Sequence, residues 1–166
     1  MTIDWLGLSK EFGTSFGKHA AQIALAKILG EEEITQAVQD YVAGCDGSEL
    51  IWCVLRLLKP EAARSECLLT VRTSSNQEAR RAAAELFRVV ANRSSLPVVR
   101  EFLADGETSI QVCGAWVVDY LVLDGECRDL EDLGPYLAEM SSHPNPSVNE
   151  EARQVLESLS LIQRRS

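Results

Sequence analysis

Trp116, Asp119 and Tyr120 are the residues of this chain whose types and spacing are best suited to bind a ligand. Their separations of three and four residues place all three on one side of a helix. A carboxylate beside two aromatic rings can hold the cationic side chain of a basic partner. The alternative is that Trp116 and Tyr120 pack as core between helices, which explains Asp119 less well.

Acidic residues accumulate around this group. Residues 1–100 contain 12 acidic and 12 basic residues, so the net charge of -9 belongs to residues 101–166. Ten acids and one base, Arg128, lie between Glu101 and Glu139; the acids are Glu101, Asp105, Glu107, Asp119, Asp124, Glu126, Asp129, Glu131, Asp132 and Glu139. Singly they fit a solvated surface or helix N-termini. As a cluster they repel one another and predict a basic partner. The predicted partner-binding residues are Trp116, Asp119, Tyr120, Asp124, Glu126, Asp129, Glu131 and Asp132.

The motifs of catalysis and metal binding are missing from the sequence. There is no Gly-x-Ser-x-Gly and no Walker loop, and neither His19 nor His143 falls in a recognisable Cys-His or Ser-His arrangement. The five cysteines include no C-x-x-C pair. We therefore expect no catalytic residues, no metal and no cofactor, and a protein that is not an enzyme.

Composition restricts the partners and the compartment. A pI near 4.7 means that phosphate backbones are repelled, so nucleic acid is not expected as a ligand. The first residues show no basic lead followed by an apolar segment, and the longest apolar run is the six residues 50–55. An odd number of cysteines fits a reducing environment. We expect no membrane association and a cytoplasmic location.

A repeat determines which elements must position these residues. Five segments align without gaps over twelve residues each, and they begin at Thr14, Asp46, Asn76, Glu107 and Asn145. Their fourth, eighth and eleventh places are mostly apolar and lie on one helix face. The eighth place is always small (Ala21, Cys53, Ala83, Gly114 and Ala152), which lets a neighbouring helix approach closely.

Each interval between segments has room for one more helix, so the repeating unit is a helix pair. The intervening helices are expected over Ile3–Phe12, Glu31–Ala43, Pro60–Thr73, Pro97–Ala104 and about Asp129–Ser141. Pro97 and Pro135 each precede a segment start by ten residues, which supports the register. The sequence predicts an all-α chain of five pairs in one domain, 1–166, with repeats at about 1–30, 31–59, 60–92, 93–125 and 126–166.

The chain resembles the HEAT-repeat family, and in particular its short bacterial branch related to the phycobilin-lyase repeats. The resemblance rests on the stretches Leu133–Met140 with Asn145–Ala152, and on Asn76–Ala83. These stretches match the sequence pattern of the family, in which a first helix with a proline is followed by Asp-x-x-Val-Arg-x-x-Ala. Only Arg80 keeps the arginine of the fifth place. The resemblance implies an α-α solenoid whose second helices line a groove, and it implies little about function, since this scaffold serves unrelated tasks.

Two helices of the repeat carry further expectations. Residues 50–55 are apolar all round their helix, which favours complete burial over the alternative that Ile51 and Trp52 face the groove. Arg80, Arg81, Glu85 and Arg88 include i,i+4 pairs and are expected to brace neighbouring loops or one another.

The sequence thus predicts a non-catalytic module that binds a basic protein through its groove and acidic C-terminal repeats. An immunity or antitoxin-type inhibitor of a bacterial toxin domain is the more specific hypothesis, since the chain is small, acidic and without catalytic motifs. The alternatives are a general scaffold or adaptor, or a lyase-like or DNA-glycosylase-like HEAT enzyme. Trp116 and Asp119 resemble the tryptophans and aspartate of such glycosylases, but DNA requires a basic surface.

Overall fold

The computed structural model describes residues 18–127 and 129–163, without the side chains of Lys18, His19 and Gln163. This part of the chain is all-helical and contains no strand. Its helices are α2 (Lys18–Leu29), α3 (Glu31–Val42), α4 (Ser48–Leu58), α5 (Glu61–Thr73), α6 (Gln77–Val90), η1 (Arg93–Ser95), α7 (Leu96–Leu103), α8 (Thr108–Leu123), α9 (Leu130–Ser141) and α10 (Pro146–Gln163).

The helix boundaries agree closely with the repeat. α4, α6, α8 and α10 begin one or two residues after the predicted segment starts, and α3, α5, α7 and α9 fall on the predicted intervening helices. Local chemistry sets several of these ends: the Asn76 side chain accepts hydrogen bonds from the first turn of α6, and Pro97 lies in the first turn of α7. The expected helix Ile3–Phe12 lies outside the described residues.

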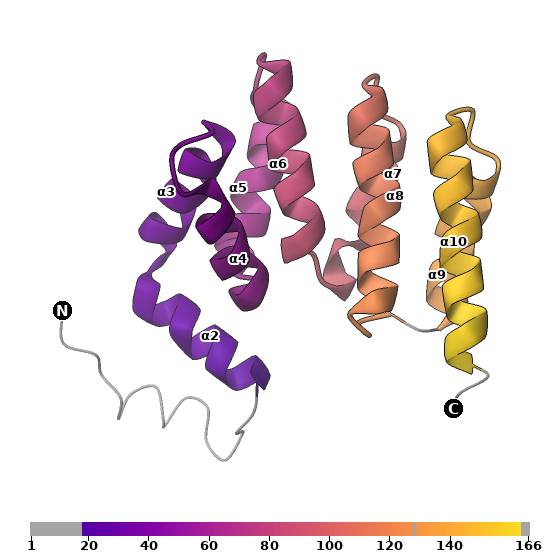
Figure 1. Cartoon of the computed structure of the whole chain (residues 1–166), viewed down its shortest axis with the longest axis horizontal. Helices are drawn as coiled ribbons and strands as arrows, with labels where there is room; N and C mark the ends of the chain where they lie inside the picture. The colour runs from indigo at the N-terminus through magenta and orange to yellow at the C-terminus, as the bar shows by residue number, and fades with distance from the viewer. Residues whose placement is uncertain (1–17, 128, 164–166) are drawn as a thin grey trace.

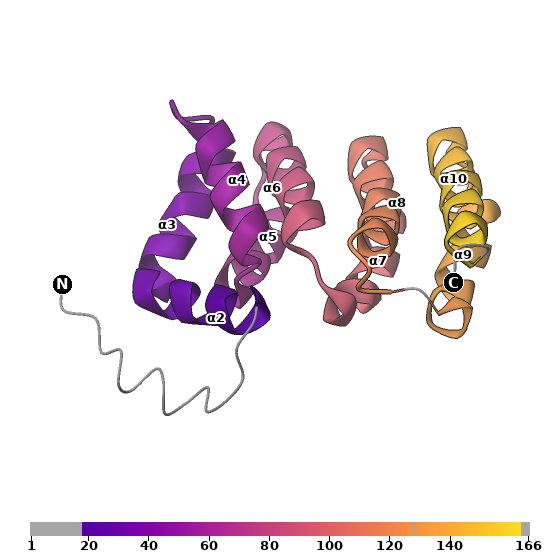
Figure 2. The same cartoon turned by 60° about the horizontal axis from the view of Figure 1, so that its bottom comes forward.

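Neighbouring helices pack in a regular order. α3 contacts α4, α5 contacts α6, α7 contacts α8 and α9 contacts α10. α4, α6, α8 and α10 also contact one another in succession, and Figures 1 and 2 show α6, α8 and α10 side by side along the long axis. We call the surface formed by these four helices the second-helix face. It positions Trp116, Asp119 and Tyr120 on α8.

The core is concentrated from α5 to α10. Ala83 and Ala152 are completely buried at their eighth places. Gly114 is needed for close approach, since a Cβ there would lie 2.8 Å from Cβ of Phe102 and 3.3 Å from the Val99 carbonyl oxygen. The expected close contact at the eighth place is therefore present in these three segments.

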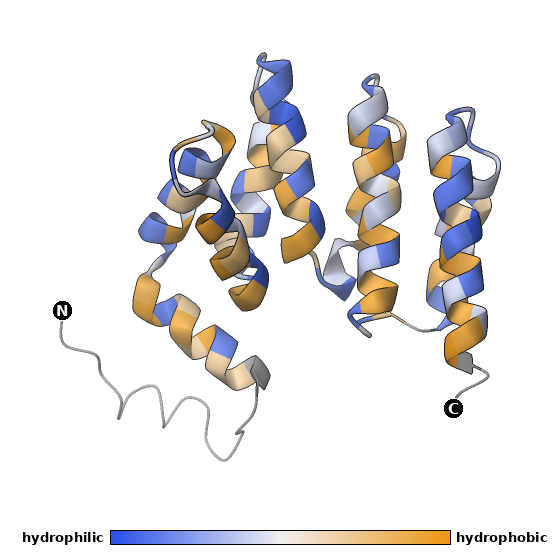
Figure 3. Cartoon of the chain, in the orientation of Figure 1, coloured by the Kyte–Doolittle hydropathy of each residue, from blue (hydrophilic) through white to orange (hydrophobic). Residues whose placement is uncertain are grey.

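α2 and α4 depart from this pattern. Cys53 and Ala21, the small residues of their segments, are exposed. The expectation that residues 50–55 are completely buried is wrong, because Leu50 is 70% exposed and Ile51 and Trp52 are half-buried. α4 contacts α2, α3 and α6, and these described helices leave one apolar side of α4 exposed. Figure 3 shows the apolar character of α2 and α4.

Candidate functional site

The predicted residues of α8 lie on the second-helix face and are half-buried. Trp116, Asp119 and Tyr120 follow one another along the helix, and both rings pack against the edge of the core. Each ring therefore packs against the core with one part, and leaves another part accessible to a partner. Side chains of neighbouring helices complete two separate clusters around them.

The first cluster joins α6, α8 and α10 at Trp116. The indole Nε1–H of Trp116 donates a hydrogen bond to Oε2 of Glu151 at 3.1 Å, and the Arg88 guanidinium lies 4.9 Å from the centre of the Trp116 ring. Glu151 is only 9% exposed. Asp119 completes the cluster, because its carboxylate interacts electrostatically with both Arg88 and Glu151. We call these four residues the Trp116 cluster.

The carboxylates of the Trp116 cluster are held in an unfavourable environment. Burial raises the pKa of Asp119, and Arg88 offsets this only in part. Burial also raises the pKa of Glu151, and the charge of Asp119 raises it further. Within the described residues, neither carboxylate lies within ion-pair distance of Arg88, whose Nε is buried without a hydrogen-bond partner. The cluster therefore retains unused capacity to bind a charged or polar group.

The second cluster surrounds Tyr120 and is occupied by bases from the end of α4. Arg56 Nε donates a hydrogen bond to the Tyr120 hydroxyl at 2.7 Å, and Lys59 Nζ lies 5.3 Å from the centre of the ring. Lys59 also pairs with Asp124, and its Nζ lies 3.8 Å from an oxygen of Glu126. Three of the predicted partner-binding residues are thus already in contact with cations of the chain itself.

Most of the acidic cluster is paired in the same way. Bases that precede residue 101 form ion pairs with seven of its ten acids: Arg72 with Glu101, Arg80 with Asp105 and Glu107, Lys59 with Asp124 and Glu126, Arg93 with Asp132, and Arg100 with Glu139. Each base lies earlier in the chain than its acid; Arg72, Arg80, Arg93 and Arg100 reach to the next helix pair, and Lys59 reaches from the end of α4 to the end of α8. We call this set the ion-pair ladder. Because the ladder supplies counter-charges, repulsion among these acids does not require an external partner.

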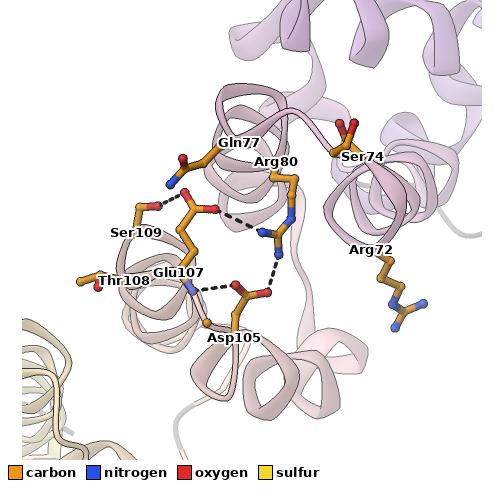
Figure 4. A pocket seen from close by; sticks show the side chains of 10 residues that line it. Arg72, Ser74, Gln77, Arg80, Asp105, Glu107, Thr108 and Ser109 are labelled. Carbon is orange, nitrogen blue, oxygen red and sulfur yellow. Dashed lines mark hydrogen bonds and ion pairs between the residues drawn. The ribbon is translucent and has the colours of Figure 1, made fainter.

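Arg80 forms the least exposed step of the ladder. Its guanidinium lies 2.6 Å from Asp105 and 3.2 Å from Glu107, and its Nε donates to the Val71 carbonyl oxygen at 2.9 Å. Figure 4 shows Arg80 between these two acids, beside a polar pocket at the ends of α6 and α8. The expectation that Arg80 braces a neighbouring loop is confirmed, and the i,i+4 pair of Arg81 with Glu85 is present at 3.7 Å.

The remaining predicted residues belong to the start of α9. The Asp129 carboxylate accepts a hydrogen bond from the Glu131 backbone N–H at 2.9 Å and caps the helix. Glu131 is exposed in the first turn, where the helix dipole favours an acid. Both positions have a structural explanation within α9.

Sequence reasoning missed Glu151, Arg88, Arg56 and Lys59 as members of these clusters. One signal was available: Arg88 and Asp119 each stand twelve residues after the start of their segments, so the repeat places them at equivalent positions of adjacent helices. Glu151 and the bases of α4 carry no such signal, because their contacts depend on how far long side chains reach between helices.

His143 has hydrogen-bond partners, and three of the five cysteines, Cys67, Cys113 and Cys127, are buried. His143 Nε2 lies 3.0 Å from the Leu103 carbonyl oxygen, and its Nδ1 accepts from the Asn145 backbone N–H. All five cysteines are free, and burial raises the pKa of the Cys113 thiol to about 12, which disfavours a nucleophilic thiolate. Among the described residues, no three His, Cys, Asp or Glu side chains converge as metal ligands. No described helix is long and apolar enough to span a membrane.

Comparison with known proteins identifies no relative. No family model, no curated protein and no solved structure matches the chain.

Proposed function

We propose that the chain is a non-catalytic protein-binding module, built as a solenoid of HEAT-like helix pairs, that engages a basic protein with its second-helix face. The in-register repeat and the succession of contacts from α4 to α10 support the solenoid. An extended face of this kind suits a protein better than a small substrate. Inhibition of a basic toxin domain by an immunity-type protein is the specific role that fits the size and charge of the chain.

The observation that carries the proposal is the Trp116 cluster. The half-buried Asp119 and the buried Glu151, whose carboxyl pKa values are both raised, lie beside an indole ring and lack an ion pair among the described residues. A lysine or arginine of a partner that enters between them would neutralise their repulsion and use their free acceptors. The other predicted residues are largely satisfied within the chain, so the binding energy is expected to centre on Trp116, Asp119 and Glu151.

The test is capture of a basic protein from the host cells of this chain, followed by affinity measurement with purified components. Replacing both carboxylates, by Asp119→Asn with Glu151→Gln, should weaken binding at least tenfold, which corresponds to about 1.4 kcal/mol. Glu150→Gln is the matched control, because Glu150 is exposed and pairs with Arg153 on the same helix. Affinity should fall as salt is raised and as pH is lowered through the pKa values of the two carboxyls.

The rival functions predict different results. Equal binding by the double variant and the wild type, or binding that ignores salt, contradicts the proposed site. Turnover of a substrate that Asp119→Asn abolishes would favour an enzyme. A toxin gene beside the gene for this chain would favour the immunity role over a general scaffold.

A further inference from the structure

A second surface, distant in sequence from the Trp116 cluster, lies between α3 and α4. It is an apolar groove of about 230 Å³. The residues that line it are Leu29, Glu33, Ile34, Ala37, Leu50, Ile51, Val54 and Leu55. All but one are apolar, and Ile34 and Leu55 form its buried floor. The groove is therefore continuous with the core below it.

The side chains beside the groove form an uncovered apolar stripe along α4. Leu50, Cys53, Val54 and Leu57 follow at i, i+3, i+4 and i+7, the spacing of one helix face. Leu50 is 70% exposed and Leu57 is 58% exposed. Burying a leucine contributes roughly 1.5–3 kcal/mol, so covering this stripe would yield substantial binding energy. A second helix laid along α4 would match its spacing.

The charged residues at the rim of the groove are acidic. Glu33 is its only charged lining residue, Glu31 and Glu32 share the first turn of α3 with it, and Glu49 precedes Leu50. Within the part of the chain that the structure describes, none of these four carboxylates forms an ion pair, whereas seven acids of the C-terminal cluster do. The nearby base Arg56 is held by Trp52 and Tyr120.

We propose that this groove and stripe dock an amphipathic helix of a basic protein, with apolar residues toward α4 and lysine or arginine beside Glu33 and Glu49. Charge complementarity selects this occupant: an apolar floor with unpaired acids at its rim favours a helix that is apolar on one face and basic at its flanks. The proposal adds a second contact surface to the proposed function and does not depend on the Trp116 cluster.

The probe is a synthetic 18-residue helix with leucines on one face and lysines at its flanks, labelled with fluorescein. Its affinity for the full chain is measured by fluorescence anisotropy, and a counterpart with glutamate in place of lysine serves as the charge control. We expect the lysine peptide to bind and the glutamate peptide to bind at least tenfold more weakly. Leu50→Ser with Leu57→Ser should weaken binding of the lysine peptide more than tenfold, and Glu33→Gln a few-fold.

Matched variants distinguish peptide binding at the groove from non-specific binding to exposed leucines or acids, and from binding at the Trp116 cluster. Leu123→Ser with Leu69→Ser alters leucines that are 64% and 53% exposed on other helices, and Glu78→Gln removes an exposed acid of α6. These variants, and Asp119→Asn with Glu151→Gln, should bind the peptide like the wild type. If only the Asp119 and Glu151 variant loses binding, the groove proposal fails while the proposed function stands.

Other occupants give distinct results that overturn the proposal. A wild-type chain that sediments as a dimer, and becomes a monomer with Leu50→Ser and Leu57→Ser, would assign the surface to a second copy. If the peptide binds only after Trp5→Ser and Leu8→Ser have been introduced, the surface would be assigned to the chain's own residues 1–17. No binding, or equal binding by the Leu50 and Leu57 variant, would exclude an amphipathic basic helix.

Discussion

The two ends of the described chain differ in whether their acidic side chains form ion pairs and in whether their apolar side chains are buried. From α5 to α10, bases from one helix pair meet acids of the next, and the small residues Ala83, Gly114 and Ala152 are buried. In α2 to α4, acids such as Glu33 form no ion pair among the described residues, and apolar side chains such as Leu50 are exposed. Among the described residues, the region with the larger net charge therefore pairs most of its acids, whereas α2 to α4 pair none of theirs.

This contrast shows why net charge alone misplaces a binding surface. The count of acids between Glu101 and Glu139 is correct, but their counter-ions lie in residues 59–100, which contain eight bases and four acids. Coulomb attraction depends on the distance between charges and not on which half of the sequence holds them. A surface for a charged partner must be sought where the fold leaves charge without a neighbour of opposite sign.

The largest expected effect tests the packed region. Ala83→Asp should destabilise the chain by several kcal/mol, because it introduces an unpaired charge at a site with no solvent exposure. Ala138→Asp is the control, since Ala138 is exposed on α9. Urea unfolding measures both, and an Ala83→Asp variant as stable as the wild type would contradict the close contact at the eighth place.

Gly114→Ala tests the closest helix contact in this region. The new Cβ would lie 2.8 Å from Cβ of Phe102, which should cost about 1–3 kcal/mol through overpacking. Gly134→Ala adds a methyl group on α9 that meets nothing within 4 Å beyond its chain neighbours, so its effect should be smaller. Equal losses of stability for both variants would show that helix propensity, and not packing, governs Gly114.

The ion-pair ladder is tested at Arg80 against its neighbour Arg81. Arg80→Met should cost about 1–2 kcal/mol, because Asp105 and Glu107 lose a partly buried counter-charge. Arg81→Met removes only an exposed pair with Glu85 and should change stability by less than about 0.5 kcal/mol. Thermal unfolding at low and high salt separates the two, and equal effects would mean that the ladder does not stabilise the stack.

The smallest effect concerns the sign of the pH dependence. The pKa of Glu151 is raised in the folded chain, so its protonation favours folding and its contribution to stability falls as pH rises through that pKa. Glu151→Gln keeps an acceptor for Trp116 and removes the buried charge, so at pH 7 it should stabilise by up to about 1 kcal/mol, or a few degrees in Tm.

Glu101 serves as the opposite case in the same pH titration. Hydrogen bonding to Arg72 lowers the pKa of Glu101, so its stabilising contribution is present at neutral pH and is lost as pH falls through its folded pKa. Glu101→Gln should therefore destabilise slightly at pH 7, with the effect reduced by solvent exposure. A Glu151→Gln variant that destabilises at pH 7 would contradict the environment assigned to Glu151.

The all-helical class and the helix boundaries could be predicted well because their signals are local and repeated. Caps such as Asn76, turn prolines such as Pro97 and the small residues at the eighth place each act within one helix or its nearest neighbour. The site could be predicted only in part: the spacing of Trp116, Asp119 and Tyr120 determined a shared face. The contact of Arg56 with Tyr120 joins residues 64 apart and depends on how far a long side chain reaches past an intervening helix. Such contacts produce no repeating pattern in the sequence.

The order of charges in the ladder also bears on how the chain emerges during synthesis. Every base of the ladder is translated before its acid, so a nascent chain that ends near residue 100 contains the five bases Lys59, Arg72, Arg80, Arg93 and Arg100 without the acids that later pair with them. Residues 1–100 contain equal numbers of acidic and basic residues, so this part of the chain carries no net charge until the acidic segment follows it. The acids between Glu101 and Glu139 therefore supply counter-charges to helices that have already been synthesised.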